Sequence, residues 1–379
     1  MLRPYCLVLV LGFLTAACAP LRRAEPPAAA APARVLLFIG DGAGVGTWTI
    51  ARIAAESLAI EKFPVVGLVD TRNAFGRITD SAAGATALAT GVRTFNRAAG
   101  VGPDSVPRRT VLELAEERGL ATGLVTNSYL TDATPAAFAS HVPNRSLRAE
   151  IADQIAAQGI DVLLGGGRGW FDGSLRPDSQ NRLPDLCTHY ACLWSAAEFR
   201  GLDLARTQTL LGLFARSEMF YTEEPVPSLP EMTAAALAVL DGDPDGFFLM
   251  VETESTDEWT HERKALDPVR AAALELDRAV AVGLQYQARH AETLIVVVGD
   301  HETGGLSLDQ DTAGVWSLAY TSAPPAPSNV GGHTPMLVPV FARGPGAERF
   351  GGMLPNTRVG ELLLEAVRRP GRVVAQLAQ

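Results

Sequence analysis

Short aliphatic runs recur along the chain from residue 34 onward, and they constrain its fold more than any other feature. Segments with helix-like spacing, such as Thr110–Arg118 and Asp267–Ala288, stand between them. The runs occupy residues 35–40, 121–127, 160–167, 246–252, 293–300 and 336–344. Continuous Val, Ile, Leu and Phe runs are typical of parallel strands buried on both faces. The sequence therefore predicts an α/β fold, a three-layer α/β/α sandwich around a mainly parallel central sheet.

The start of the chain has the layout of an export signal. Arg3 precedes a short apolar run and then small residues, a pattern typical of a secretory signal and too short for a membrane span. The stretch LTAAC resembles a bacterial lipoprotein signal, whose cleavage would leave Cys18 as a lipidated N-terminus; simple cleavage nearby is the alternative. We expect a signal over residues 1–18, an Ala/Pro-rich tether over 19–33 and an exported domain over 34–379, periplasmic or anchored to the membrane.

Charge and cysteine usage narrow the classes of partner. The net charge of −10 and the lack of a basic cluster argue against nucleic acid as a specific partner. Cys187 and Cys192 are most simply a local disulfide in an exported protein, because only His189 stands beside them and zinc usually takes four ligands. The irregular stretch 168–230, which holds this pair, is interpreted as an insertion or lid over the edge of the sheet.

Acids and a histidine recur at the ends of the aliphatic runs. The residues are Asp41, Glu252, Asp300 and His301, and Asp132 and Thr134 come shortly after another run. In open α/β sheets ligands collect beyond the carboxyl ends of the strands. A single acid there is commonly a helix cap or a turn residue, but several together indicate a site.

The stretch VETESTDEWTH, residues 251–261, carries the sharpest spacing. His261 follows Asp257 at i+4, which places both side chains on one helix face. Carboxylate and imidazole together suit a zinc-like ion, although the same pattern alone also fits a solvated helix start. His333 in GGHTP, just before the last run, adds a third candidate ligand in a chain with only six histidines.

The stretch TDSAAGATALATG, residues 79–91, combines one acid and one serine with very small residues. Asp80 or Ser81 can cap a first helical turn, the alanines propagate the helix, and Gly91 can end it. Taken alone, a capped alanine helix and a catalytic serine are equally good interpretations.

Six segments in the same order along the chain resemble the alkaline phosphatase family. They are FIGDGAG, TDSAAGATALATGVRT, DATPAAFASHVPNR, FFLMVETESTDEWTH, VVVGDHETGG and GGHTPMLVPVFARGPGAERFGG. The resemblance covers roughly residues 34 to 370. It implies an alkaline phosphatase-like fold and hydrolysis of small phosphate monoesters, expected to be faster at alkaline pH.

The resemblance also implies a role for each matching residue. Ser81 is the nucleophile, Arg145 clamps the phosphate, Asp132 lies near magnesium, and Asp80 positions Arg145. The cofactors are two Zn²⁺ and one Mg²⁺. The implied ligands are Asp257, His261 and His333 for one zinc, Asp41, Asp300 and His301 for the other, and Asp41, Thr134 and Glu252 for magnesium.

The implied residues suit the chemistry. Two cations about 4 Å apart can stabilise the attacking and leaving oxygens of an in-line displacement at phosphorus. Mixed Asp and His ligands suit zinc, whereas an all-oxygen set suits magnesium. An arginine can hold two phosphate oxygens bidentately, and a helix N-terminus adds favourable N–H groups around the serine.

The chain also departs from well-known members of the family. Glu258 stands where they carry Lys, His or Trp, and we expect it to point outward as a surface acid, because an unpaired acid beside bound phosphate is costly. The family usually forms a homodimer, but only 31 residues separate His301 from His333, which leaves little room for the crown insertion of animal members. The alternatives are a phosphodiesterase of the same superfamily and a non-catalytic phosphate-binding surface lipoprotein.

Overall fold

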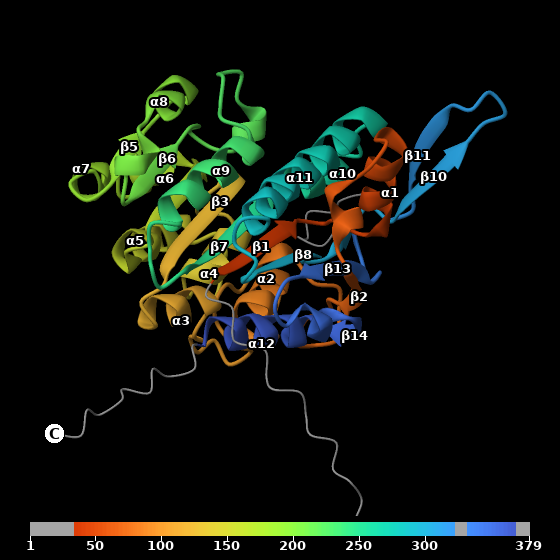
Figure 1. The fold of residues 1–379 in the computed structure, drawn as a ribbon, viewed down its shortest axis with the longest axis horizontal. Coiled ribbons are helices and arrows are strands. Elements are labelled where there is room, and N and C mark those ends of the chain that lie inside the picture. The colour runs from red at the N-terminus through yellow and green to blue at the C-terminus, as the bar shows by residue number, and fades with distance from the viewer. Residues whose placement is uncertain (1–33, 323–331, 369–379) are drawn as a thin grey trace, which may run out of the picture.

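The computed structural model describes residues 34–322 and 332–368, and its centre is a ten-stranded sheet (Figure 1). In order across the sheet the strands are β14 Gly352–Pro355, β2 Val65–Asp70, β13 Val338–Arg343, β8 Thr293–Gly299, β1 Arg34–Gly40, β7 Phe247–Thr253, β3 Ala121–Tyr129, β4 Val162–Gly166, β6 Leu210–Leu213 and β5 Ala191–Leu193. β13 runs antiparallel to β8 and β2, and all other neighbouring pairs are parallel. The predicted signal, Cys18 and tether lie outside the described residues.

Helices cover both faces of this sheet (Figure 1). One face carries α2 Ser81–Thr90, α3 Val111–Glu117, α4 Ala133–Ala139, α5 Arg148–Gln158 and α12 Asn356–Val367. The other carries α1 Val45–Ala54, α9 Leu229–Leu240 and α11 Leu266–Gln287. The predicted three-layer α/β/α sandwich with a mainly parallel sheet is confirmed.

Shorter elements lie in the connections. The helical ones are η1 Ala59–Lys62, α6 Arg168–Phe171, α7 Leu183–Leu186, α8 Ala196–Gly201, η2 Leu204–Arg206, η3 Met219–Tyr221, α10 Ser255–His261 and η4 Ala347–Phe350. β9 Glu302–Thr303 pairs with β12 His333–Thr334. β10 Leu306–Gln310 and β11 Trp316–Tyr320 form a hairpin that projects from the body of the molecule (Figure 1).

Strand β1 shows why the aliphatic runs are continuous. Val35, Leu37 and Ile39 pack on the α2/α12 face, while Leu36 and Phe38 pack on the α11 face, and all five are fully buried. Both sides of the strand therefore need apolar residues. Each of these side chains contributes about 2 kcal/mol of hydrophobic stabilisation when it leaves water.

Strands β2, β5, β6 and β14 were not predicted from the sequence. Residues Val66 and Leu68 of β2 are exposed, so this strand lacks a continuous buried run. β5 and β6 lie inside the stretch 168–230, and they extend the sheet at its edge beside β4. No helix of the described segments is long and apolar enough to cross a membrane.

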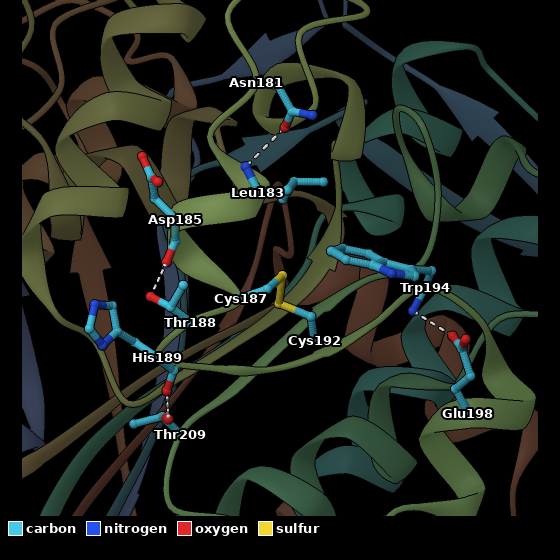
Figure 2. Close-up of a disulfide and its surroundings, with 10 residues drawn as sticks. All are labelled: Asn181, Leu183, Asp185, Cys187, Thr188, His189, Cys192, Trp194, Glu198 and Thr209. Atoms are coloured by element: carbon cyan, nitrogen blue, oxygen red, sulfur yellow. Dashed lines mark hydrogen bonds between the residues drawn. A yellow bond between two sulfur atoms is a disulfide. The ribbon is translucent and has the colours of Figure 1, made fainter.

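A disulfide joins Cys187 to Cys192, as the sequence predicted (Figure 2). It closes the short loop between α7 and β5. The backbone carbonyl of His189 in that loop accepts a hydrogen bond from Thr209 Oγ1, and its imidazole lies away from the two sulfur atoms (Figure 2). The disulfide therefore links this loop covalently to the edge strand β5, which contains Cys192.

Candidate active site

The carboxyl ends of neighbouring parallel strands bring buried acids to one edge of the sheet. β1 lies between β7 and β8, and the ends of the three strands are level. Asp41 follows β1, Glu252 lies at the end of β7, and Asp300 follows β8; all three are buried. Asp41 therefore meets two acids that are more than two hundred positions away in the sequence, as the ends of the aliphatic runs predicted.

Helix α10 and strand β12 bring a second group of ligand atoms to the same place. His261 Nε2 lies 3.1 Å from Asp257 Oδ2 and 2.8 Å from His333 Nε2. His333 Nδ1 is 2.9 Å from the carbonyl oxygen of Thr79, so its Nδ1–H donates there and Nε2 is free to face the site. The i+4 spacing of Asp257 and His261 therefore places both toward the site, as predicted.

His301 lies between the two groups of candidate ligands. Its Nε2 is 3.1 Å from Asp41 Oδ1 and 3.4 Å from Asp300 Oδ2, and its ring stacks on His333 with centroids 3.8 Å apart. Two sets of side chains can each point one ligand atom into a space less than 4.8 Å across: Asp41, Asp300 and His301, and Asp257, His301 and His333. The structure brings His261 to the second set through its contacts with Asp257 and His333.

Ser81 opens helix α2 beside this cluster. Asp80 is the N-cap and accepts a hydrogen bond from Ala83 N at 3.1 Å, and Gly91 ends the helix with φ of 70°. Ser81 Oγ lies 3.3 Å from His301 Nε2. The predicted capped helix is confirmed, and its serine faces the candidate metal ligands.

The small residues of α2 allow backbone to approach backbone. A Cβ atom added at Gly84 would stand 2.7 Å from the carbonyl oxygen of Asp300, and one added at Gly360 of α12 would stand 2.3 Å from the carbonyl oxygen of Ala87. Every residue of α2 is buried. A helix with larger side chains could not bring Ser81 this close to the turn that carries Asp300.

Arg145 points into the site from the loop after α4, and two acids hold it. Its Nη2 lies 2.7 Å from Asp132 Oδ1, and its Nη1 lies 3.9 Å from Asp80 Oδ2. Burial opposes the charge on Arg145, but the two carboxylates outweigh burial and raise its pKa. Arg97 links these parts: its N–H donates to Asp80 Oδ2 at 2.9 Å, and its carbonyl accepts from Arg145 N at 2.7 Å.

Glu252 and Thr134 are two of the three magnesium ligands that the family resemblance implies, together with Asp41. Thr126 Oγ1 donates to Glu252 Oε2 at 2.6 Å, which leaves Oε1 of Glu252 without a protein partner. Thr134 lies in the first turn of α4, two residues after Asp132, and Ser128 Oγ donates to Asp132 Oδ2 at 3.0 Å. Hydroxyl groups of β3 thus orient the carboxylates at this end of the site.

These residues fit divalent cations. Four buried oxygen atoms of the predicted metal ligands have no hydrogen-bond partner among the described residues: Asp41 Oδ1, Thr134 Oγ1, Glu252 Oε1 and Asp300 Oδ2. Leaving such atoms unpaired is costly. Burial, together with neighbouring carboxylates, raises the pKa values of Asp41 and Asp300 and brings the pKa of Glu252 to about 7. A bound cation supplies the missing partner and reverses this penalty.

Sequence reasoning missed the residues that hold the ligands in place. Thr303 Oγ1 hydrogen-bonds to Asp257 Oδ1 and lies 3.1 Å from His301 Nδ1, and Thr126 and Ser128 act on Glu252 and Asp132 as described above. A polar hydroxyl in the middle of an otherwise aliphatic run, as at Thr126, is a usable signal. Thr303, two residues after His301, has no comparable signal in the sequence.

Glu258 is half-buried rather than a free surface acid. Tyr221 of η3 donates a hydrogen bond to Glu258 Oε1 at 2.5 Å. Burial raises the pKa of Glu258, with the carboxylates of Asp257 and Glu262 adding to the effect. Glu258 is therefore not the ordinary surface acid that we expected, because it contacts the stretch 168–230.

Comparison with known proteins decides the family. The family model for alkaline phosphatase matches residues 33–326, which is most of the chain. The chain belongs to the alkaline phosphatase family. An alkaline phosphatase 3 of Bacillus subtilis (strain 168) is 30% identical over 88% of this chain and 88% of its own length. A streptomycin-6-phosphate phosphatase of Streptomyces griseus is 36% identical over 92% of this chain and 93% of its own.

Solved alkaline phosphatases agree with this assignment. The alkaline phosphatase of the Antarctic bacterium TAB5 superposes with a TM-score of 0.80 at 30% identity, over 89% of this chain and 98% of that one. A mutant of the same enzyme, with magnesium bound in its M3 site, superposes with a TM-score of 0.77 at 30% identity, over 90% and 99% of the two chains. Alkaline phosphatases are metal-dependent phosphomonoesterases, and this chain has the clustered Asp and His groups that metal binding requires.

Proposed function

We propose that this chain is an exported alkaline phosphatase that hydrolyses phosphate monoesters through a phosphoserine intermediate on Ser81, with two zinc ions and one magnesium ion. One observation carries the proposal. The hydroxyl of Ser81, two Asp/His ligand sets and the guanidinium of Arg145 converge on one buried edge of the sheet. Export is proposed from the signal-like start of the sequence.

The residues fit the three ions as follows. The zinc ligands would be Asp257, His261 and His333 in one site and Asp41, Asp300 and His301 in the other, and Asp41, Thr134 and Glu252 would hold magnesium. When bound, these cations would stabilise the negative charge on the attacking and leaving oxygens of the phosphate ester.

The chain's own groups position the substrate. Arg145, fixed by Asp132, presents two donors to the nonbridging phosphate oxygens. Ser81 Oγ loses its proton to water and attacks phosphorus, the bond from phosphorus to the alcohol oxygen breaks, and the alcohol leaves after taking up a proton. Water then attacks phosphorus, the Oγ–P bond breaks, one proton of that water returns to Ser81 Oγ, and phosphate is released. The first N–H groups of α2 favour negative charge at this point.

Two assays run side by side test the function. The purified protein is analysed for zinc and magnesium and assayed at alkaline pH with p-nitrophenyl phosphate and with bis(p-nitrophenyl) phosphate. We expect bound zinc and a much higher kcat/KM for the monoester. Greater activity on the diester would support the phosphodiesterase alternative, and no activity on either ester would support a non-catalytic phosphate-binding protein.

A further inference from the structure

A short piece of the stretch 168–230 covers the outer side of helix α10. Tyr221 of η3 places its hydroxyl 2.5 Å from Glu258 Oε1 and 2.8 Å from Glu262 Oε1. A phenol has one hydrogen and can donate to only one carboxylate at a time. Two carboxylates thus share a single proton donor, and the positive charge nearest to them, on Lys264, pairs with Glu262 rather than with Glu258.

Aromatic rings flank these carboxylates. Trp259 of α10 lies edge-on to Phe220 and Tyr221, with ring centroids 5.3 and 5.5 Å apart. Lys264 Nζ lies 5.7 Å from the Trp259 ring and 2.7 Å from Glu262 Oε2, so this surface already accepts one cation. Glu258 has no such basic partner among the ion pairs of the described residues. Carboxylates beside aromatic faces are a setting that binds ammonium and guanidinium groups.

A third carboxylate on the same turn is buried and unpartnered. Glu254 is the N-cap residue of α10 and is 9% exposed, and its Oε2 has no hydrogen-bond partner among the described residues. Its carboxyl interacts electrostatically with Asp132 and Asp41 most strongly, and then with Asp257 and Glu258. Residues 217–262, which carry Tyr221 and the three glutamates, contain twelve acids and neither lysine nor arginine, although Arg263 and Lys264 follow directly.

This acidic and aromatic surface lies on the side from which the alcohol departs. The rings of His301, His333 and His261 follow one another, with centroids 3.8 and 4.7 Å apart, and Ser81 stands at the His301 end. In an in-line displacement the leaving oxygen is opposite the nucleophile. The alcohol therefore leaves at the His261 end, where α10 and η3 lie.

We propose that Glu258, with Glu254 and the rings of Tyr221 and Trp259, selects phosphate monoesters whose alcohol carries an ammonium or guanidinium group. We call these four residues the cation rim. The inference rests on the proposed phosphomonoesterase activity and adds a substrate class to it. The charged group of the alcohol would sit between the carboxylates and the rings while Arg145 holds the phosphate.

A pair of substrates of the same shape tests the rim. Phosphocholine and its uncharged carbon analogue, 3,3-dimethylbutyl phosphate, differ only by the positive charge. We expect the holoenzyme to prefer phosphocholine in kcat/KM by about five- to tenfold at low salt, and to lose most of this preference at high ionic strength. The variant Glu258→Gln should bring the ratio close to one, whereas Tyr221→Phe, which keeps the ring and both carboxylates, should keep or raise it.

Controls separate the two proposals. Glu348→Gln, an exposed acid of η4 outside the rim, should leave the ratio unchanged. A ratio near one in the unaltered protein, or a ratio that Glu258→Gln does not change, would overturn the rim while turnover of p-nitrophenyl phosphate keeps the proposed function. Failure to turn over p-nitrophenyl phosphate as well would overturn both.

Discussion

The hydroxyl of Thr126 illustrates how single residues tune this site. It donates to Glu252 Oε2 at 2.6 Å, which leaves Oε1 without a protein partner and available to the proposed magnesium ion. We expect Thr126→Val to raise the magnesium concentration needed for half-maximal activity by about ten- to a hundredfold. The reason is that the Glu252 carboxylate would no longer be held in one orientation. Titration of activity with magnesium measures this. Thr126→Ser keeps the hydroxyl and should behave as the unaltered protein; an equal effect of both substitutions would contradict the role of the hydrogen bond.

A second residue, Glu116, couples stability to pH away from the site. Burial raises its pKa to about 7 in the folded protein, while in the unfolded chain it ionises near its ordinary value of about 4.5. Stability is therefore fully present below about pH 4.5, falls as the pH rises toward 7, and stays lower above it.

Glu116→Gln should remove this dependence. Because Glu116 is partly exposed, we expect a modest gain of about 1 kcal/mol in unfolding free energy at pH 8.5, which shrinks toward pH 5. Denaturant unfolding at the two pH values measures the gain, with Glu56→Gln on an exposed position as control. A gain of the same size at both pH values would show that another cause is at work.

At the scale of elements, the close packing of α2 is the feature on which the site depends most. Ala in place of Gly84 would press against the backbone oxygen of Asp300, where the gap is 2.7 Å. We expect Gly84→Ala to destabilise the protein by about 1–3 kcal/mol and to lower kcat/KM at least tenfold, because Ser81 and Asp300 are pushed apart. Thermal unfolding and steady-state assays measure the two effects.

Helix α8 provides the matched control for this substitution. Its residue Gly201 has no atom within 4 Å of an added Cβ. Gly201→Ala should therefore be neutral or raise stability by about 0.5–1 kcal/mol, because alanine is the better helix former. If both substitutions have the same effect, close packing is not what requires glycine at position 84.

The strands differ in how well they could be predicted from the sequence. β1, β3, β4, β7, β8 and β13 were predictable, because strands buried on both faces need continuous apolar runs. β2 and the short β5 and β6 were not, since β2 lacks a continuous buried run and β5 and β6 are only three and four residues long. The antiparallel direction of β13 depends on its pairing with β8 and β2, which no local pattern encodes.

At the scale of the whole molecule, the site was predictable only as a set. No single ligand indicates a site alone, as is the case for Asp41, Asp257, Asp300 and His333. Only the motifs that carry them, which occur in the order of one family, pointed to a single site. What sequence could not show is how they are held: the carbonyl of Thr79 orients His333, and Tyr221 reaches across to Glu258. These contacts join segments far apart in the chain and depend on the finished fold.

Metal removal tests the whole site through its stability. The acids at this edge bury oxygen atoms that lack protein partners, so the folded protein should bind cations that the unfolded chain does not. We expect EDTA to abolish activity and to lower the unfolding free energy by about 4 kcal/mol at a metal concentration a thousandfold above Kd, with recovery on adding zinc and magnesium. Unchanged melting and activity after complete chelation would contradict the metal assignment.

Trapping the intermediate tests whether Ser81 carries the phosphoryl group. The zinc- and magnesium-loaded protein is mixed with a phosphate monoester, quenched with acid within one turnover and digested for mass spectrometry. We expect phosphate on the peptide that contains Ser81, and a loss of kcat/KM of about a thousandfold or more in Ser81→Ala. Phosphate on a different residue, or a Ser81→Ala variant that keeps the original activity, would contradict it.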